Sequence, residues 1–114
     1  MLHAAVLDAE ARPARKDPWL QAVAMRDHLE ARPVAERTRA RFDDTLNAFR
    51  RVYHENPSAS KAPAAVTAVA DLLAEKGRVL KESASLRAAV GQYEFLREQY
   101  PDSPQVSNAL LLEA

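Results

Sequence analysis

Proline sets the strongest limit on what this chain can fold into. Seven prolines and two glycines stand between stretches that otherwise lack helix breakers. Proline interrupts a helix interior because it lacks a backbone donor and its ring clashes with the preceding turn. These residues therefore divide the chain into segments of ordinary helix length, and abundant alanine favours helix within each segment. The predicted fold class is all-α.

The segments between breakers predict a series of helices. Asp17 and Pro18 offer an N-cap followed by proline in the first turn, for a helix from 18 to about 31. Further helices are expected at about 34–55, at 60–76, and from Leu80 or Ser83 to Gln99. Ser58 or Ser60 would cap the third, and Gly77 would follow its last turn. Residues 3–11 can form a short helix ahead of these, and Asp102-Ser103-Pro104 would start a last one. Apolar residues at helical spacing predict the core: Phe42, Leu46, Phe49 and Tyr53, then Ala62, Ala65, Val66, Val69, Leu72 and Leu73, then Leu86, Val90, Tyr93, Leu96 and Tyr100.

The helix–proline–helix pattern occurs twice. Pro57 and Pro101 stand 44 residues apart (101 − 57). At that offset the large apolar positions coincide: Phe42 with Leu86, Leu46 with Val90, Phe49 with Tyr93, Val52 with Leu96, Ala65 with Ala109 and Val66 with Leu110. A helical hairpin that recurs at a few tens of residues is typical of a solenoid.

Two stretches carry a resemblance to a known family. FRRVYHENPSASKAPAAV (49–66) and YEFLREQYPDSPQVSNAL (93–110) resemble tetratricopeptide repeats of bacterial envelope proteins, in which an aromatic-rich helix ends in a Tyr-Pro-x-Ser turn. They are also similar to the helical region that precedes the catalytic domain in some N-acetylmuramoyl-L-alanine amidases. The resemblance implies an α-α superhelix with a binding role, located in the periplasm or cell envelope.

The resemblance divides the chain at residue 37. It implies that residues 1–37 form an N-terminal helical segment and that residues 38–114 form two hairpins, of which we expect the second to be truncated. The pattern departs from the family in two respects. Its period exceeds the usual repeat of about 34 residues, and Leu46 and Val90 stand where the first helix of a repeat has a small residue.

Composition excludes several classes of protein. Sixteen basic residues balance sixteen acidic ones, so no net charge directs the chain to nucleic acid or anionic lipid. Cysteine is absent, which excludes disulfides and thiolate zinc sites. No apolar run reaches the roughly 20 residues that a membrane-spanning helix needs.

Residues that could support catalysis are not grouped. His3, His28 and His54 are far apart in sequence, and no Gly-x-Ser-x-Gly turn or phosphate-binding glycine loop is present. The serines near helix ends are better explained as caps. We therefore expect no catalytic residue, no cofactor and no metal, and hence no enzyme unless the chain belongs to a longer one.

The predicted function is protein–protein binding by a non-catalytic helical scaffold. In the resembled family, partners dock on the first helix of each hairpin. The polar positions there are Asp43, Asn47, Arg50, Arg51, Arg87 and Glu94. A cytoplasmic adaptor of the same fold remains open. So does a helical bundle that binds nucleic acid, because seven arginines against five acids lie between Arg26 and Arg51.

The C-terminal leucines suggest a further contact. Leu110, Leu111 and Leu112 are consecutive, so they cannot all face one buried side of a helix. We expect this end either to continue into a longer protein or to mediate self-association.

Overall fold

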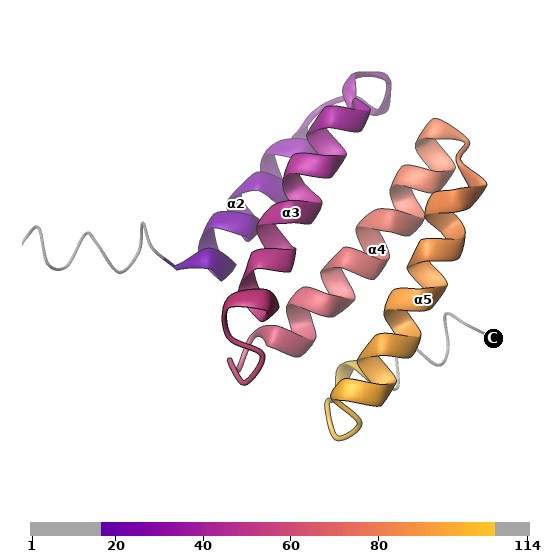
Figure 1. Ribbon diagram of the computed structural model, residues 1–114. Coiled ribbons are helices and arrows are strands. Elements are labelled where there is room, and N and C mark those ends of the chain that lie inside the picture. Colours follow the sequence, from indigo (N-terminus) through magenta and orange to yellow (C-terminus); the bar gives the residue numbers. More distant parts are fainter. Residues whose placement is uncertain (1–16, 107–114) are drawn as a thin grey trace, which may run out of the picture.

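A computed structural model describes residues 17–106 of the chain. This part is all-α: helices α2 (Pro18–Ala31), α3 (Arg39–Glu55), α4 (Ala62–Leu80) and α5 (Ser83–Gln99), with the short 3-10 helix η1 (Val34–Glu36) between α2 and α3. Each helix packs against the next one in the chain, and α3, α4 and α5 run side by side with α2 against the far side of α3 (Figure 1). None of the helices in 17–106 combines the length and apolarity that crossing a membrane requires.

The start of α2 is as predicted, whereas the start of α3 is later. The Asp17 side chain accepts hydrogen bonds from the backbone N–H groups of Trp19 and Leu20, with Pro18 in the first turn. The stretch expected to be helical from residue 34 instead forms η1. Thr38 then caps α3 by accepting from the Arg41 N–H. A local side-chain cap thus defines where the helix begins.

The core lies where α3 and α4 meet. The predicted stripe of Phe42, Leu46, Phe49 and Tyr53 is buried, and the inward residues predicted for α4 are buried as well. Many of the core residues of α4 are alanines, which allow close approach of neighbouring helices. Trp19 of α2 packs edge-on against Phe49, with ring centroids 5.6 Å apart. This contact joins α2 to the core.

Helix α4 does not end at Gly77 as predicted. It continues to Leu80 and ends at Lys81, which adopts the left-handed conformation with φ of 56°. Ser58 and Ser60 do not cap its start, where Lys61 makes no side-chain capping bond. Gly77 is buried because α5 comes so close: a Cβ there would lie 2.6 Å from Leu86 Cγ and 3.0 Å from the Glu82 carbonyl oxygen. Close approach, not a turn, explains this glycine.

We expect Gly77→Ala to destabilise the fold although alanine is the better helix former. The propensity gain is about 1 kcal/mol, whereas forcing a group into an occupied space costs about 1–3 kcal/mol. Urea unfolding should show a net loss for Gly77→Ala, and a smaller one when Leu86→Ala removes most of the clash. Equal losses in both backgrounds would contradict this explanation.

The buried face of α5 differs from the predicted one. Tyr93 and Leu96 are buried as expected, but Leu86 and Val90 are 40% and 46% exposed. Ser85 and Ala89 occupy the buried positions instead. The reason is that α5 is the last described helix in the row, so within residues 17–106 no further helix covers its outer side.

Two tyrosines fasten α5 to the rest of the fold. The Tyr93 hydroxyl donates to Asp71 Oδ1 of α4 at 2.6 Å, and the Tyr100 hydroxyl donates to the Pro57 carbonyl at 2.8 Å. Burial, together with the hydrogen bond and negative charge of Asp71, raises the pKa of Tyr93. The Tyr100 bond connects the end of α5 to the turn between α3 and α4.

The two proline turns share a backbone hydrogen bond. Ala59 N–H donates to the Asn56 carbonyl at 3.0 Å, and 44 residues later Ser103 N–H donates to the Tyr100 carbonyl at 3.0 Å. Ser103 Oγ accepts from the Gln105 N–H at 3.3 Å, and the helix predicted to start there extends beyond the described residues. The predicted helix at 3–11 and the leucines at 110–112 lie outside the described residues, and the division at residue 37 stays a prediction.

Candidate functional site

A groove runs between α2 and α3. It consists of two adjoining hollows of about 200 and about 600 Å³ that share Met25 and Asp44. The first is lined by Met25, His28, Leu29, Arg32, Arg41, Asp44 and Thr45, and the second by Gln21, Ala24, Met25, Asp44, Asn47, Ala48 and Arg51.

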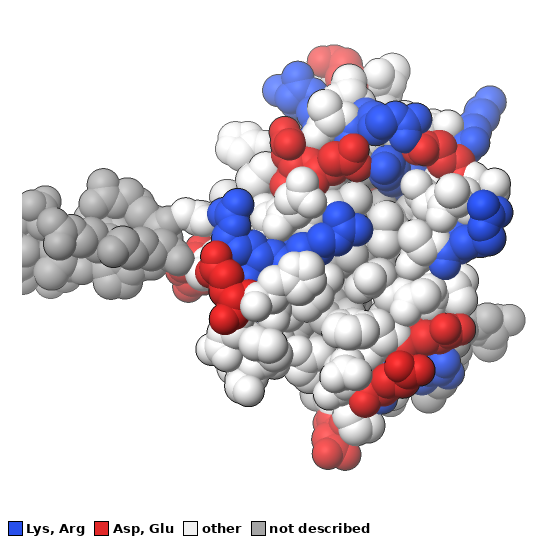
Figure 2. All heavy atoms as spheres, viewed as in Figure 1, with Lys and Arg blue, Asp and Glu red and all other residues white. Residues whose placement is uncertain are grey.

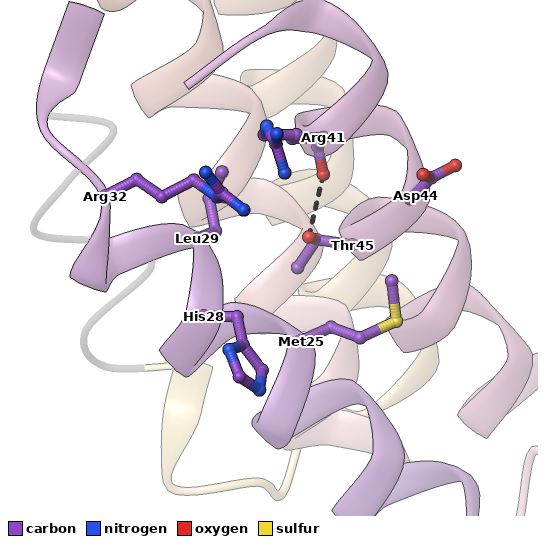
Figure 3. A pocket seen from close by; sticks show the side chains of 7 residues that line it. All are labelled: Met25, His28, Leu29, Arg32, Arg41, Asp44 and Thr45. Carbon is purple, nitrogen blue, oxygen red and sulfur yellow. Dashed lines mark hydrogen bonds between the residues drawn. The ribbon is translucent and has the colours of Figure 1, made fainter. Parts of the chain in front are cut away.

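The groove residues of α2 lie on the side of the helix that faces α3. On α2, Met25 and Leu29 are four residues apart, which places them on one side of the helix. Arg32 follows the last residue of α2 and caps it with an extended backbone. Leu29 and Ala48 are buried and form an apolar floor. The buried Thr45 hydroxyl donates to the Arg41 carbonyl at 2.8 Å, so the floor presents no unsatisfied polar group there (Figure 3).

Met25 gives the groove an exposed apolar centre. Its side chain reaches from α2 toward α3 (Figure 3) and is 37% exposed. Methionine is unbranched and adapts to irregular surfaces, which suits a residue that contacts a ligand side chain.

Positive charge predominates along the groove. Three arginines and one histidine line it, against a single acid, Asp44. Arg32 forms an ion pair with Glu36 at 3.9 Å, and Arg51 forms one with Glu55 at 4.0 Å. Both pairs are exposed to solvent and therefore weak. Arg41 makes no ion pair within residues 17–106. The guanidinium groups therefore remain able to bind an anionic group.

The end of the bundle where α3 begins shows the opposite arrangement. There blue and red side chains alternate over the tops of α3, α4 and α5 (Figure 2). Arg37 pairs with Glu75 at 2.6 Å, Lys76 pairs with Asp43 at 2.9 Å, and Arg39 pairs with Glu82. The Arg39 guanidinium lowers the pKa of the Glu82 carboxyl through their hydrogen bond. These charges neutralise one another and hold segments together, so this end offers little to a ligand.

Two of the six predicted binding residues lie in the groove. Asn47 and Arg51 line its larger hollow. Arg50 lies beside them and donates to Asn47 Oδ1 at 3.4 Å, which leaves the Asn47 amide NH₂ as a donor.

The other three predicted residues lie elsewhere. Asp43 is engaged by Lys76 of α4. Arg87 and Glu94 are exposed on α5 and line neither hollow. The structure therefore does not bring the six residues together into a single site.

Several groove residues were not predicted, namely Met25, His28, Arg32, Arg41 and Asp44. The sequence contained one signal for them: seven arginines lie between residues 26 and 51, which include Arg32 and Arg41. Among residues 17–106, no three His, Asp or Glu side chains are grouped so that they could hold a metal ion.

Comparison with known proteins provides no further assignment. No protein-family model matches the chain, and neither the curated proteins nor the solved structures contain a significant match.

Proposed function

We propose that this chain is a non-catalytic helical scaffold that binds a protein partner through the groove between α2 and α3. The observation that carries the proposal is the composition of the groove: an apolar floor, an exposed methionine and an excess of arginines that the described residues leave largely unneutralised. Apolar centres bordered by arginine are typical of protein interfaces.

A tetratricopeptide-like arrangement is part of this proposal. Its main support is the recurrence of the proline turn with the same backbone bond after 44 residues. Burial recurs at that offset for two of the aligned pairs, Phe49 with Tyr93 and Val52 with Leu96, but not for Phe42 with Leu86 or Leu46 with Val90. The bond from Tyr100 to Pro57 joins the two turns, as neighbouring units of a helical repeat would require.

Location in the bacterial envelope, including a role beside a cell-wall amidase, is proposed from the resemblance of the Tyr100-Pro101-Asp102-Ser103 turn. A cytoplasmic adaptor would use the same groove. The binding experiment below applies to both locations, because it depends only on the described surface.

Unbiased peptide selection tests the proposed function. The purified chain is immobilised and exposed to a displayed library of random twelve-residue peptides, and enriched sequences are synthesised and titrated against the free chain by calorimetry. We expect saturable binding with one peptide per chain.

A second measurement, retention of the chain on immobilised DNA or RNA, distinguishes protein binding from the alternative function of nucleic-acid binding. Retention on immobilised DNA or RNA that weakens steeply with salt, with no enriched peptide, would replace protein binding by nucleic-acid binding. Peptide enrichment without such retention is the result that the proposed function requires.

A further inference from the structure

From the charges and spacing in the groove, we infer that its ligand is an extended peptide segment with the pattern acid–x–apolar–x–acid. The inference rests on the proposed function and adds the chemical class of the partner. It assigns one acidic side chain to the end formed by Arg32 and Arg41, an apolar side chain to Met25, and the second acid to Arg51.

The distance between the cationic ends sets the spacing of the acids. Arg41 and Arg51 lie on the same helix, ten residues apart, which corresponds to roughly 15 Å along the axis. An extended peptide advances about 3.3 Å per residue, so acids four residues apart span about 13 Å. The flexible arginine side chains can bridge the small difference between these two lengths.

The residue between the acids follows from the centre of the groove. Met25 and Asp44 belong to both hollows, so they lie where the hollows join. The Asp44 carboxylate would repel an acid at this point, whereas the Met25 side chain offers apolar contact. In an extended peptide, positions 1, 3 and 5 share one face. Acid, apolar and acid residues at these positions therefore point into the groove together.

An extended segment fits better than a helix. An amphipathic helix in a groove needs several apolar anchors spaced three and four residues apart. Among the groove residues, Met25 alone is a large exposed apolar side chain, whereas Leu29 and Ala48 are buried and Ala24 is small. Asn47 lines the larger hollow, and its amide NH₂ suits the carbonyl acceptors of an extended backbone.

Fluorescence anisotropy with defined peptides tests the inference. The probe is a fluorescein-labelled peptide with the centre Glu-Ser-Leu-Ser-Glu and Gly-Ser flanks, measured against peptides with Lys for both Glu or Ser for Leu. We expect binding of the first peptide only. Arg41→Glu and Arg51→Glu should each weaken it by about tenfold or more, the equivalent of about 1.4 kcal/mol.

Arg87→Glu is the matched control, because it makes the same charge change on the exposed surface of α5. It should leave the affinity unchanged. Circular dichroism of each variant verifies that the helices are intact.

Equal weakening by Arg87→Glu, or equal binding of the Lys peptide, would overturn the inference. Enrichment of library peptides that lack the pattern and are insensitive to Arg41→Glu would also overturn it, yet leave the proposed function intact. Absence of any selected peptide would instead count against the proposed function.

Discussion

Leu46→Ala is expected to lower the free energy of unfolding by about 3 kcal/mol, within the range for leucine-to-alanine changes in cores. Leu46 is 1% exposed and lies in the cluster between α3 and α4, beside fully buried Phe42 and Phe49. Its removal loses apolar burial and leaves a cavity that packed helices close only in part. Urea unfolding followed by far-UV circular dichroism measures the loss.

Leu86→Ala provides the matched comparison. The 44-residue repeat aligns both residues with large apolar positions, yet Leu86 is 40% exposed. Partial exposure should limit its loss to about 1 kcal/mol. Comparable losses for Leu46→Ala and Leu86→Ala would mean that α5 buries the face predicted from sequence, which would contradict the described packing.

Arg37→Ala is expected to cost about 2–3 kcal/mol, because one side chain satisfies three partners. Its guanidinium donates to the backbone carbonyls of Glu30 and Arg32, each at 3.0 Å, and to Glu75 Oε1 of α4 at 2.6 Å. The carbonyls at the end of α2 have no helical donor of their own. Arg37 therefore fixes the end of α2 and connects it to α4, and its side chain is only 17% exposed.

Two further variants, Arg37→Lys and Arg39→Ala, show whether Arg37 stabilises the fold by its hydrogen-bond geometry or by its charge alone. Lysine keeps the charge but lacks the planar fork, so Arg37→Lys should recover less than half of the loss. Arg39 pairs with Glu82 at the surface, and Arg39→Ala should cost clearly less than Arg37→Ala. Thermal unfolding of the three variants in parallel gives the order; full recovery by lysine would show that charge alone acts at residue 37.

The sequence predicted those features of the fold that local chemistry determines. Asp17 and Pro18 are adjacent and form a cap without help from distant residues, so the start of α2 was predictable. Gly77 was not, because a glycine after a helix and a glycine beneath a neighbouring side chain look alike in sequence. Only the position of Leu86 distinguishes the two cases. The burial of α5 likewise depends on which helices surround it.

The groove was predictable only from its α3 side. Asn47 and Arg51 follow from the polar face of one amphipathic helix. Met25 belongs to α2 and Arg32 caps its end, and their position opposite α3 depends on the packing of α2 on α3, which includes the contact of Trp19 with Phe49. That contact joins residues 30 positions apart (49 − 19), so helical periodicity within one segment carries no information about it.

Mapping of the binding surface by NMR tests the central claim most directly. The ¹⁵N-labelled chain is titrated with the peptide that selection enriches most strongly, and amide shift changes are followed residue by residue. We predict that the largest changes fall in two stretches that line the groove, residues 21–32 in α2 and its C-cap and residues 41–51 in α3. Changes confined to α5 around Leu86 and Val90, with the α2–α3 groove unaffected, would contradict the account.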